Sequence, residues 1–381
     1  MQHRILRKSL VVGIVSILLI SAYIPLNGYA QETSRGKNDS NVYYSYDQLS
    51  SLLEYLQLKY PEIFLYSSLG KTYGGRNLWL VKISDNVTIE EDEPAILYTG
   101  GIHGNENPGY QVVIYSLKAI VENYTHAYVN ESFTNRIKSI VNTTELYFIP
   151  MVNPDGIEAN VRKNRQPNNC TFGGTLFRGV DLNRNFDYNW DDVFKHPFRY
   201  IVIPRTLDEL IYVITTKNIN LFGRASVIYP FLDWKSLYGM GYYRGPYPFS
   251  ENETQAVKRF IDNHTITISV DYHIFGEGIE YPQLWNYTPE SDKTIFVSIA
   301  QNISKINGYK FDTEKKLKWA NRSGLLEYWA YATHNIFSFI IELCDSGKLV
   351  IFPDKVEILK LCNTHLLVNL YLAERVHTIG S

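Results

Sequence analysis

Residues 95–108 read AILYTGGIHGNENP, and this stretch combines the three signals that decide the fold. Its first four residues form a short apolar run typical of a buried strand, and a pair of glycines ends that run. His103 and Glu106 follow, and a helical pattern then continues to about Glu122. At this spacing an imidazole and a carboxylate can lie on one side of a helical turn and bind one metal ion. A strand, a polar turn and a helix in this order indicate an α/β protein.

The same alternation of apolar strands and helices continues along the chain. The sequence predicts strands at 63–69, 78–83, 95–98, 146–152, 265–272 and 336–343, and helices at 46–57, 108–122, 133–140, 250–262, 292–307 and 355–375. A capping box at Ser250-Glu251-Asn252-Glu253 is expected to begin the fourth of these helices. The strands are apolar on both faces, so helices should cover both sides of the sheet. We therefore expect a single-domain α/β/α sandwich with a mixed, mostly parallel central sheet covered by helices.

The composition is that of a globular protein: 381 residues, 45% hydrophobic and 20% charged. A formal net charge of −2 gives no reason to expect nucleic acid as a partner. The three cysteines, Cys170, Cys344 and Cys362, allow at most one disulfide, and their pairing stays open. None lies in a Cys-x-x-Cys pair, so a thiolate zinc site is not expected.

The N-terminus has the pattern of an export signal. Basic residues within the first eight positions precede an apolar run at 10–25, and Gly28-Tyr29-Ala30 resembles a small-residue cleavage site. We predict a signal peptide at 1–30 followed by a polar tether at 31–42, with an uncleaved membrane anchor as the alternative.

Asn-x-Ser/Thr sequons support export. Composition alone predicts roughly three or four of them, whereas the chain has eleven, at Asn38, Asn86, Asn123, Asn130, Asn142, Asn169, Asn252, Asn263, Asn286, Asn302 and Asn321. The excess predicts a glycosylated outer surface.

Polar side chains also follow the apolar strands, at or just beyond the point where each ends: His103, Asn153, His273 and Glu342. In open α/β sheets ligand sites form at strand ends. Burial within an apolar strand would raise the pKa of Glu342 toward the range of a general base. A satisfied core histidine for His273 and an ion pair with arginine for Glu342 are the alternatives.

Two further polar clusters stand out. Asn183 and Arg184 lie in a segment dense in hydrogen-bonding groups, and together they can clamp a carboxylate through a bidentate fork and an extra donor. Arg162-Lys163-Asn164-Arg165 is a basic run, for which a solvated loop is the usual alternative.

From about residue 43 to about residue 371 the chain resembles the zinc metallocarboxypeptidases, the carboxypeptidase A/B group with the bacterial carboxypeptidase T-like enzymes. Seven blocks in the same order carry this resemblance: 69–76, 101–106, 150–156, 179–186, 243–251, His273 and 342–347. An ordered set of this size is far more specific than any of its members alone.

The resemblance implies one Zn²⁺ per chain, bound by His103, Glu106 and His273, with water in the open fourth position. It implies that Glu342 activates this water as general base and then passes the proton to the leaving amine. The implied reaction is hydrolysis of the C-terminal peptide bond of peptides and proteins.

The same resemblance implies roles for the two polar clusters. Arg162 matches the position that stabilises the oxyanion, and Asn183 with Arg184 matches the pair that binds the free C-terminal carboxylate. Glu327 matches the position at the base of the pocket for the C-terminal side chain, where a carboxylate would favour Lys or Arg. The alternatives are that Glu327 turns outward or that a gap shifts the loop, and Leu325 and Leu326 nearby would admit apolar side chains, so we expect a basic or broad preference.

The chain departs from the family in three places. No Tyr occupies the capping position before Ser323-Gly324, where Trp319 is the nearest aromatic residue, so substrate closure should differ. Asn105 stands where many relatives carry Arg. The chain is also longer than typical relatives at about 190–233, within a catalytic domain predicted at 43–375.

Two other functions remain as alternatives: a peptidase for unusual amide links, such as cell-wall D-amino or γ-glutamyl bonds, and a catalytically inactive binding module. Retention of all three metal ligands and of Glu342 disfavours the inactive module. We expect a secreted monomer that acts on peptide C-termini, contacts membrane only through an uncleaved N-terminal segment, and is active without a large propeptide, since the domain follows the predicted cleavage site closely.

Overall fold

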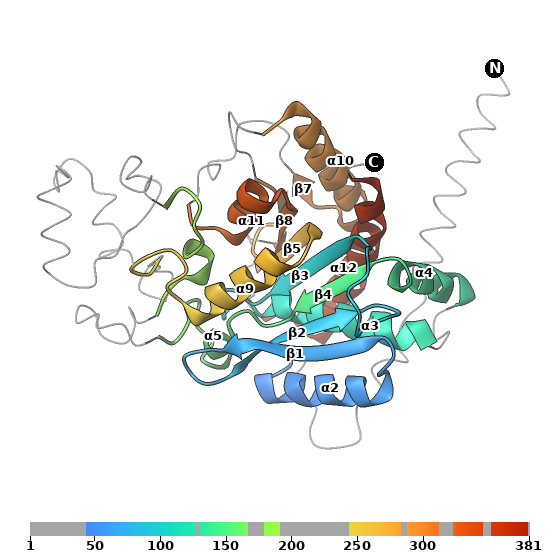
Figure 1. Cartoon of the computed structure of the whole chain (residues 1–381), viewed down its shortest axis with the longest axis horizontal. Helices are drawn as coiled ribbons and strands as arrows, with labels where there is room; N and C mark the ends of the chain where they lie inside the picture. Colours follow the sequence, from blue (N-terminus) through green and yellow to red (C-terminus); the bar gives the residue numbers. More distant parts are fainter. Residues whose placement is uncertain are drawn as a thin grey trace, which may run out of the picture.

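The computed structural model describes residues 43–125, 130–166, 179–190, 244–282, 288–311, 323–345 and 352–379. A twisted sheet of eight strands runs through the molecule, with helices on both sides (Figure 1). The strands are β1 (Phe64–Lys71), β2 (Asn77–Ile83), β3 (Ala95–Gly100), β4 (Glu145–Ile149), β5 (Ile266–Ile274), β6 (Gly278–Glu280), β7 (Lys310–Phe311) and β8 (Phe337–Leu343). The predicted α/β sandwich is confirmed.

The sheet is mixed, as predicted. Its order is β1-β2-β4-β3-β5-β8-β6-β7. The central pairings β4–β3, β3–β5 and β5–β8 are parallel, as is β6–β7, while β1–β2, β2–β4 and β6–β8 are antiparallel. Every residue of β3 and β4 is buried, which is the pattern of strands covered on both faces. The carboxyl ends of β3, β4, β5 and β8 therefore meet at one edge of the sheet.

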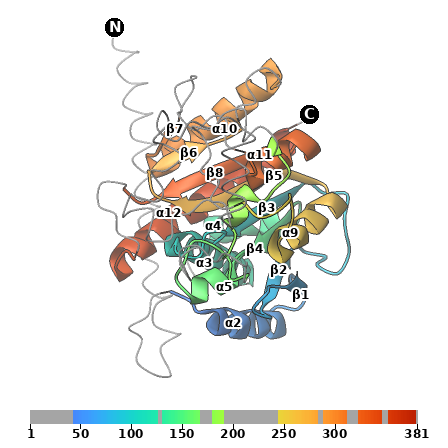
Figure 2. The ribbon, with the colours of Figure 1, turned by 90° about the vertical axis from the view of Figure 1, so that its left-hand side faces the viewer.

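Helices on one face are α2 (Tyr46–Lys59), α3 (Asn107–Thr125), α4 (Glu131–Val141), α10 (Glu290–Asn307) and α12 (Lys355–Arg375). The opposite face packs against α9 (Asn252–Asn263) and α11 (Leu326–His334). Figure 2 shows α3 and α12 on one side of β3 and β4, and α9 on the other. Two short helices, α5 (Pro154–Glu158) and the 3-10 turn η2 (Leu182–Arg184), lie near the strand ends, and η5 (Val376–Thr378) follows α12.

The capping box predicted at Ser250 is wrong. The N-cap of α9 is Glu251, which makes no side-chain capping bond. Ser250 is engaged elsewhere, because its hydroxyl donates to Glu251 Oε1 at 2.6 Å and accepts from Asn185 Nδ2 at 2.9 Å. The Ser250 hydroxyl therefore bonds to Asn185 and Glu251 and does not cap the helix.

Several sequence predictions fall outside the described residues: the N-terminal apolar run, the 190–233 insertion beyond Trp190, Trp319 and Cys170. Within the described ranges, no helix has the length and apolarity that a membrane span requires. Cys344 and Cys362 are free thiols. The sequon at Asn123 is only 1% exposed, and its Nδ2 donates to the Ala119 carbonyl, so this position does not face solvent.

Candidate metal centre and active site

The turn between β3 and α3 is tied to the end of β4. The backbone N–H groups of Val152 and Asn153 donate to the carbonyls of Gly100 and Gly101 at 3.0 and 3.1 Å. Asn153 Nδ2 lies 3.3 Å from the Ile102 carbonyl, while its Oδ1 accepts from Gly156 N and caps α5. Asn153, singled out at a strand end, therefore shapes the turn that carries the first two candidate ligands.

Close packing brings this turn to the end of β5. A Cβ added at Gly109, in the first turn of α3, would lie 2.3 Å from the carbonyl oxygen of Tyr272. Any larger residue would push α3 away from β5. The glycine thus allows His103 and Glu106, which precede α3, to approach His273 on β5.

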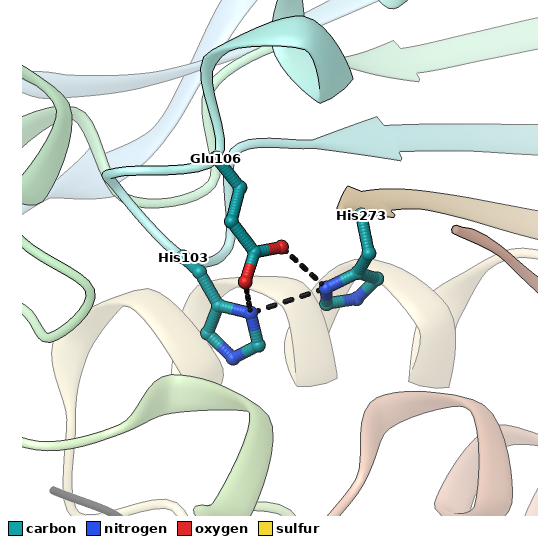
Figure 3. A group of neighbouring side chains, drawn as sticks. All are labelled: His103, Glu106 and His273. Carbon is teal, nitrogen blue, oxygen red and sulfur yellow. Dashed lines mark hydrogen bonds and ion pairs between the residues drawn. The ribbon is translucent and has the colours of Figure 1, made fainter. Parts of the chain in front are cut away.

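His103, Glu106 and His273 converge on one point (Figure 3). Glu106 places Oε1 at 2.9 Å from His103 Nδ1 and Oε2 at 2.9 Å from His273 Nδ1. The two Nδ1 atoms lie 3.1 Å apart. The three residues are 4%, 6% and 4% exposed. Two imidazole nitrogens and a carboxylate oxygen this close together form a donor set that suits Zn²⁺.

The outer nitrogen of each imidazole faces a different carboxylate. His103 Nε2 lies 3.1 Å from Asp181 Oδ1, and His273 Nε2 lies 2.9 Å from Asp271 Oδ2. An Nε2–H that donates outward leaves the Nδ1 lone pair directed inward, which is the form that binds a metal. The donor geometry therefore fits zinc at both rings.

The electrostatics of the cluster favour a positive charge at its centre. Burial acts to raise the pKa of Glu106, but His103 and His273 outweigh it and hold that pKa well below its usual range. Burial acts to lower the pKa of His273, but Asp271 and Glu106 raise it well above the usual value. A site that stabilises imidazolium in this way is equally suited to a bound cation.

Arg162 faces this cluster from the side, so its part of the basic run is not a solvated loop. Its Nη1 donates to Glu106 Oε1 at 3.1 Å and its Nε to Asp181 Oδ2 at 2.9 Å. Burial acts to raise the pKa of Asp181, yet Arg162 and His103 hold it well below its usual range. Arg165, at the other end of the run, is exposed.

Asn183 and Arg184 lie on η2, and Asn183 contacts His273, the candidate metal ligand on β5. Asn183 is 2% exposed; its Oδ1 accepts from Leu326 N at 2.8 Å, and its Nδ2 lies 3.3 Å from His273 Nε2. Arg184 is half-buried and its Nη1 donates to the Asn183 carbonyl. The proposed carboxylate clamp thus adjoins the cluster.

Glu342 is placed by strand register. In the parallel β5–β8 pair, His273 is directly opposite Glu342. Paired residues of parallel strands project to the same face of the sheet. Glu342, half-buried, therefore emerges on the same face as His273.

Glu327, on α11, is 1% exposed and does not turn outward. Its Oε1 lies 4.0 Å from His273 Nε2, and its carboxyl group lies beside that of Asp271, to which it can donate a hydrogen bond when protonated. Burial, followed by the charge of Asp271, raises the pKa of Glu327 to about 8. The structure thus brings every candidate site residue to one region.

Sequence reasoning passed over Asp181 and Asp271, the two carboxylates behind the histidines. For Asp271 a signal was present, since it stands two positions before His273 in a strand and so shares its face. Asp181 was visible only as one member of a polar segment.

The comparisons with known proteins agree with this geometry. A family model described as zinc carboxypeptidase matches residues 49–200 and 239–367. Among curated proteins, a zinc carboxypeptidase of Saccharothrix mutabilis subsp. capreolus is 25% identical over 79% of this chain and 62% of its own length. The catalytic chain of human carboxypeptidase N is 24% identical over 83% and 65%. The chain thus spans slightly less than two thirds of the length of these two relatives.

Solved structures share the fold. The crystal structure of thrombin activatable fibrinolysis inhibitor aligns with a TM-score of 0.66 at 20% identity, over 88% of this chain and 75% of its own. Carboxypeptidase A from Helicoverpa armigera aligns with a TM-score of 0.63 at 19% identity, over 97% and 82%. With the family model matching well over half of the chain, and with a donor cluster that fits Zn²⁺, the chain belongs to the zinc carboxypeptidase family.

Proposed function

We propose that this protein is an exported, zinc-dependent metallocarboxypeptidase that releases C-terminal residues from peptides and proteins. The observation that carries the proposal is the buried convergence of His103, Glu106 and His273, with Glu342 opposite His273 on the neighbouring strand. A metal-binding module without activity would need the three ligands but would not need a carboxylate at this register.

Bound zinc would supply Lewis acidity and a water of lowered pKa. Glu342 would take a proton from the attacking water and return it to the leaving amine, since it shares the face of His273 and is only half-buried. Arg162, held by Glu106 and Asp181, presents a fixed guanidinium to charge that develops on the scissile carbonyl oxygen.

Asn183 and Arg184 would bind the free carboxylate of the substrate. Arg184 is half-buried and its charge acts on Asp181, and a guanidinium in this position gains most from a carboxylate that forms two hydrogen bonds with it. A substrate cut in mid-chain could not supply this group, which restricts cleavage to the last peptide bond.

Zinc-loaded protein incubated with acyl-dipeptides tests the proposal. We expect chelator-sensitive release of the C-terminal residue, and a fall in kcat of about 10²- to 10⁴-fold in Glu342→Gln with zinc content unchanged. The panel includes D-amino and γ-glutamyl links. Turnover confined to those links would show that the protein is a peptidase for unusual amide links rather than for ordinary peptides. Zinc binding without turnover on any substrate would favour the inactive binding module.

We also propose a preference for basic C-terminal residues. Glu327 is a buried carboxyl group whose pKa is raised to about 8 by burial and by Asp271, and the positive charge of a Lys or Arg side chain beside it would favour its ionised form and pair with it. Acyl-Phe-Lys should be cleaved with a higher kcat/KM than acyl-Phe-Phe, and Glu327→Gln should reduce that ratio. A strong excess for acyl-Phe-Phe would remove Glu327 from the pocket.

Export of a monomeric, glycosylated protein rests on the sequence alone. The apolar run at 10–25 and the eleven sequons support it. N-terminal sequencing of the protein recovered from the medium of a secreting host should begin near residue 31, whereas membrane-bound protein with an intact N-terminus would show the anchor instead.

A further inference from the structure

Thr99, Asp271 and His273 form a hydrogen-bonded chain that reaches the metal-ligand histidine from the centre of the sheet. Thr99 Oγ1 donates to Asp271 Oδ1 at 2.8 Å, and Asp271 Oδ2 lies 2.9 Å from His273 Nε2. Thr99 on β3 pairs directly with Asp271 on β5 in the parallel ladder. Thr99 and Asp271 are each 1% exposed, so water does not compete for these bonds.

Asp271 is the group that can accept the Nε2 proton of His273. Among the residues that the structure describes, Asn183 Nδ2 at 3.3 Å and Glu327 Oε1 at 4.0 Å also face this nitrogen. The Leu326 N–H fixes the orientation of the Asn183 amide by donating to Oδ1, so Asn183 presents a donor rather than an acceptor. Glu327 is beyond hydrogen-bond distance. The Nε2–H therefore points to Asp271, which leaves Nδ1 as the nitrogen whose lone pair would bind the metal.

We propose that Asp271 and Thr99 are positioning residues that fix the tautomer and ring orientation of His273 and so set the zinc affinity of the site. The carboxylate holds the proton on Nε2, and the Thr99 hydroxyl holds the carboxylate in place. This arrangement is separate from the one at His103, where Asp181 is held by Arg162. The inference concerns the zinc site and does not depend on which peptide is cleaved.

Asp271→Asn is the decisive change because asparagine has the same shape but a single acceptor oxygen. If that oxygen stays with Thr99, an NH₂ group faces His273 and favours the tautomer with the proton on Nδ1, which blocks the metal. If the oxygen turns to His273, the NH₂ group faces Thr99, whose hydroxyl can then donate only to the Val270 carbonyl, 3.3 Å away, and no longer holds residue 271 through an acceptor oxygen. Partners of this kind typically contribute about 10- to 100-fold to metal affinity.

The test measures zinc affinity of the full chain by competition with a chromophoric chelator, without any peptide. We expect the Kd for zinc to rise about 10- to 100-fold in Asp271→Asn and by a smaller factor in Thr99→Val. Ser269→Ala is the matched control. Ser269 lies on the same strand and face, is buried, and donates to Ser338 Oγ at 2.8 Å, but it is not part of this chain of bonds.

Zinc affinity within twofold of the unchanged protein in Asp271→Asn would overturn the proposal, as would an equal loss in Ser269→Ala. Thermal unfolding of the zinc-free variants shows which of them fold. If Asp271→Asn fails to fold, Thr99→Val is the test variant. Unaltered zinc affinity in Thr99→Val would then refute the positioning role of Thr99 and Asp271. Because no substrate is present, a protein that binds zinc as expected but cleaves no peptide would refute the proposed function and leave this inference standing.

Discussion

His365 lies fully buried on α12, against the rings of Tyr272 and Tyr309. Its Nδ1 donates to the Leu361 carbonyl at 2.9 Å, while its Nε2 has no partner among the described residues. Burial, the largest influence, lowers the pKa of His365 to about 4. The folded protein therefore keeps this imidazole neutral at pH values where an unfolded chain would protonate it.

This difference predicts a loss of stability in mild acid. Above pH 6.5, the usual value for histidine, both states are neutral and the contribution is complete. Between pH 6.5 and about 4 only the unfolded chain binds the proton, so the free energy of unfolding falls as pH falls, by up to about 3 kcal/mol from this group. Urea titrations at pH 7 and pH 5 should show a smaller loss in His365→Gln than in the unchanged protein.

His377→Gln provides the control, because His377 is exposed just beyond the end of the same helix. It should show the same loss between the two pH values as the unchanged protein. Equal losses in all three proteins would mean that His365 does not carry the effect.

Among the elements, the Ser323-Gly324 segment is locked against η2. Gly324 has φ +73°, and a Cβ there would lie 2.1 Å from the Arg184 carbonyl oxygen. Its N–H donates to the Tyr188 carbonyl at 2.9 Å, and its carbonyl accepts from Phe186 N at 3.1 Å. The backbone at Arg184, which belongs to the proposed carboxylate clamp, thus packs so closely against Gly324 that no residue with a side chain fits at position 324.

Gly324→Ala should therefore displace Arg184 and raise KM for a peptide substrate more than it lowers kcat. Gly308→Ala is a matched control, because Gly308 has φ +77° but its added Cβ meets nothing within 4 Å in the described part of the chain. Both substitutions share the strain of a left-handed backbone, about 1–2 kcal/mol, and only the first has the collision. Steady-state kinetics and thermal unfolding measure the two effects, and an equal KM in both variants would contradict this role for Gly324.

The elements also show why some predictions from sequence succeeded. The helix predicted at 355–375 matches α12 at both ends, because Asp354 caps it and Arg375 ends its periodic pattern. By contrast α11 was missed. Leu326 to Tyr331 are all buried, which removes the periodicity, and its N-cap Leu325 makes no side-chain bond. The strands β6 and β7 have three and two residues, too few for a pattern.

For the site, sequence could predict which residues gather but not what holds them. His103 follows β3, and His273 and Glu342 lie close to the carboxyl ends of β5 and β8, which meet at one edge of the sheet. The partnership of Thr99 with Asp271 depends on β3 lying beside β5, although they are far apart in the chain. This pairing depends on the order of strands in the sheet, which cannot be predicted from the local sequence pattern around either residue.

In the whole molecule, zinc should contribute to the stability of the fold. Glu106, His103 and His273 come together only in the folded chain, so an ion bound by them stabilises the folded state. Free zinc at 100 times its Kd should stabilise the protein by about 2.7 kcal/mol. We expect chelation to lower the melting temperature in calorimetry and zinc, but not magnesium, to restore it. Identical melting curves with and without chelator would contradict this coupling.

The direct pairing of His273 with Glu342 has a consequence for how such a protein can diversify. The separation between metal ligand and proposed base is set by the spacing of adjacent strands, about 4.8 Å, and not by the chain that joins them. That connecting chain includes α11 with Glu327. Insertions or exchanges in it can therefore alter substrate choice while the reacting groups keep their places, so that selectivity and chemistry can change independently.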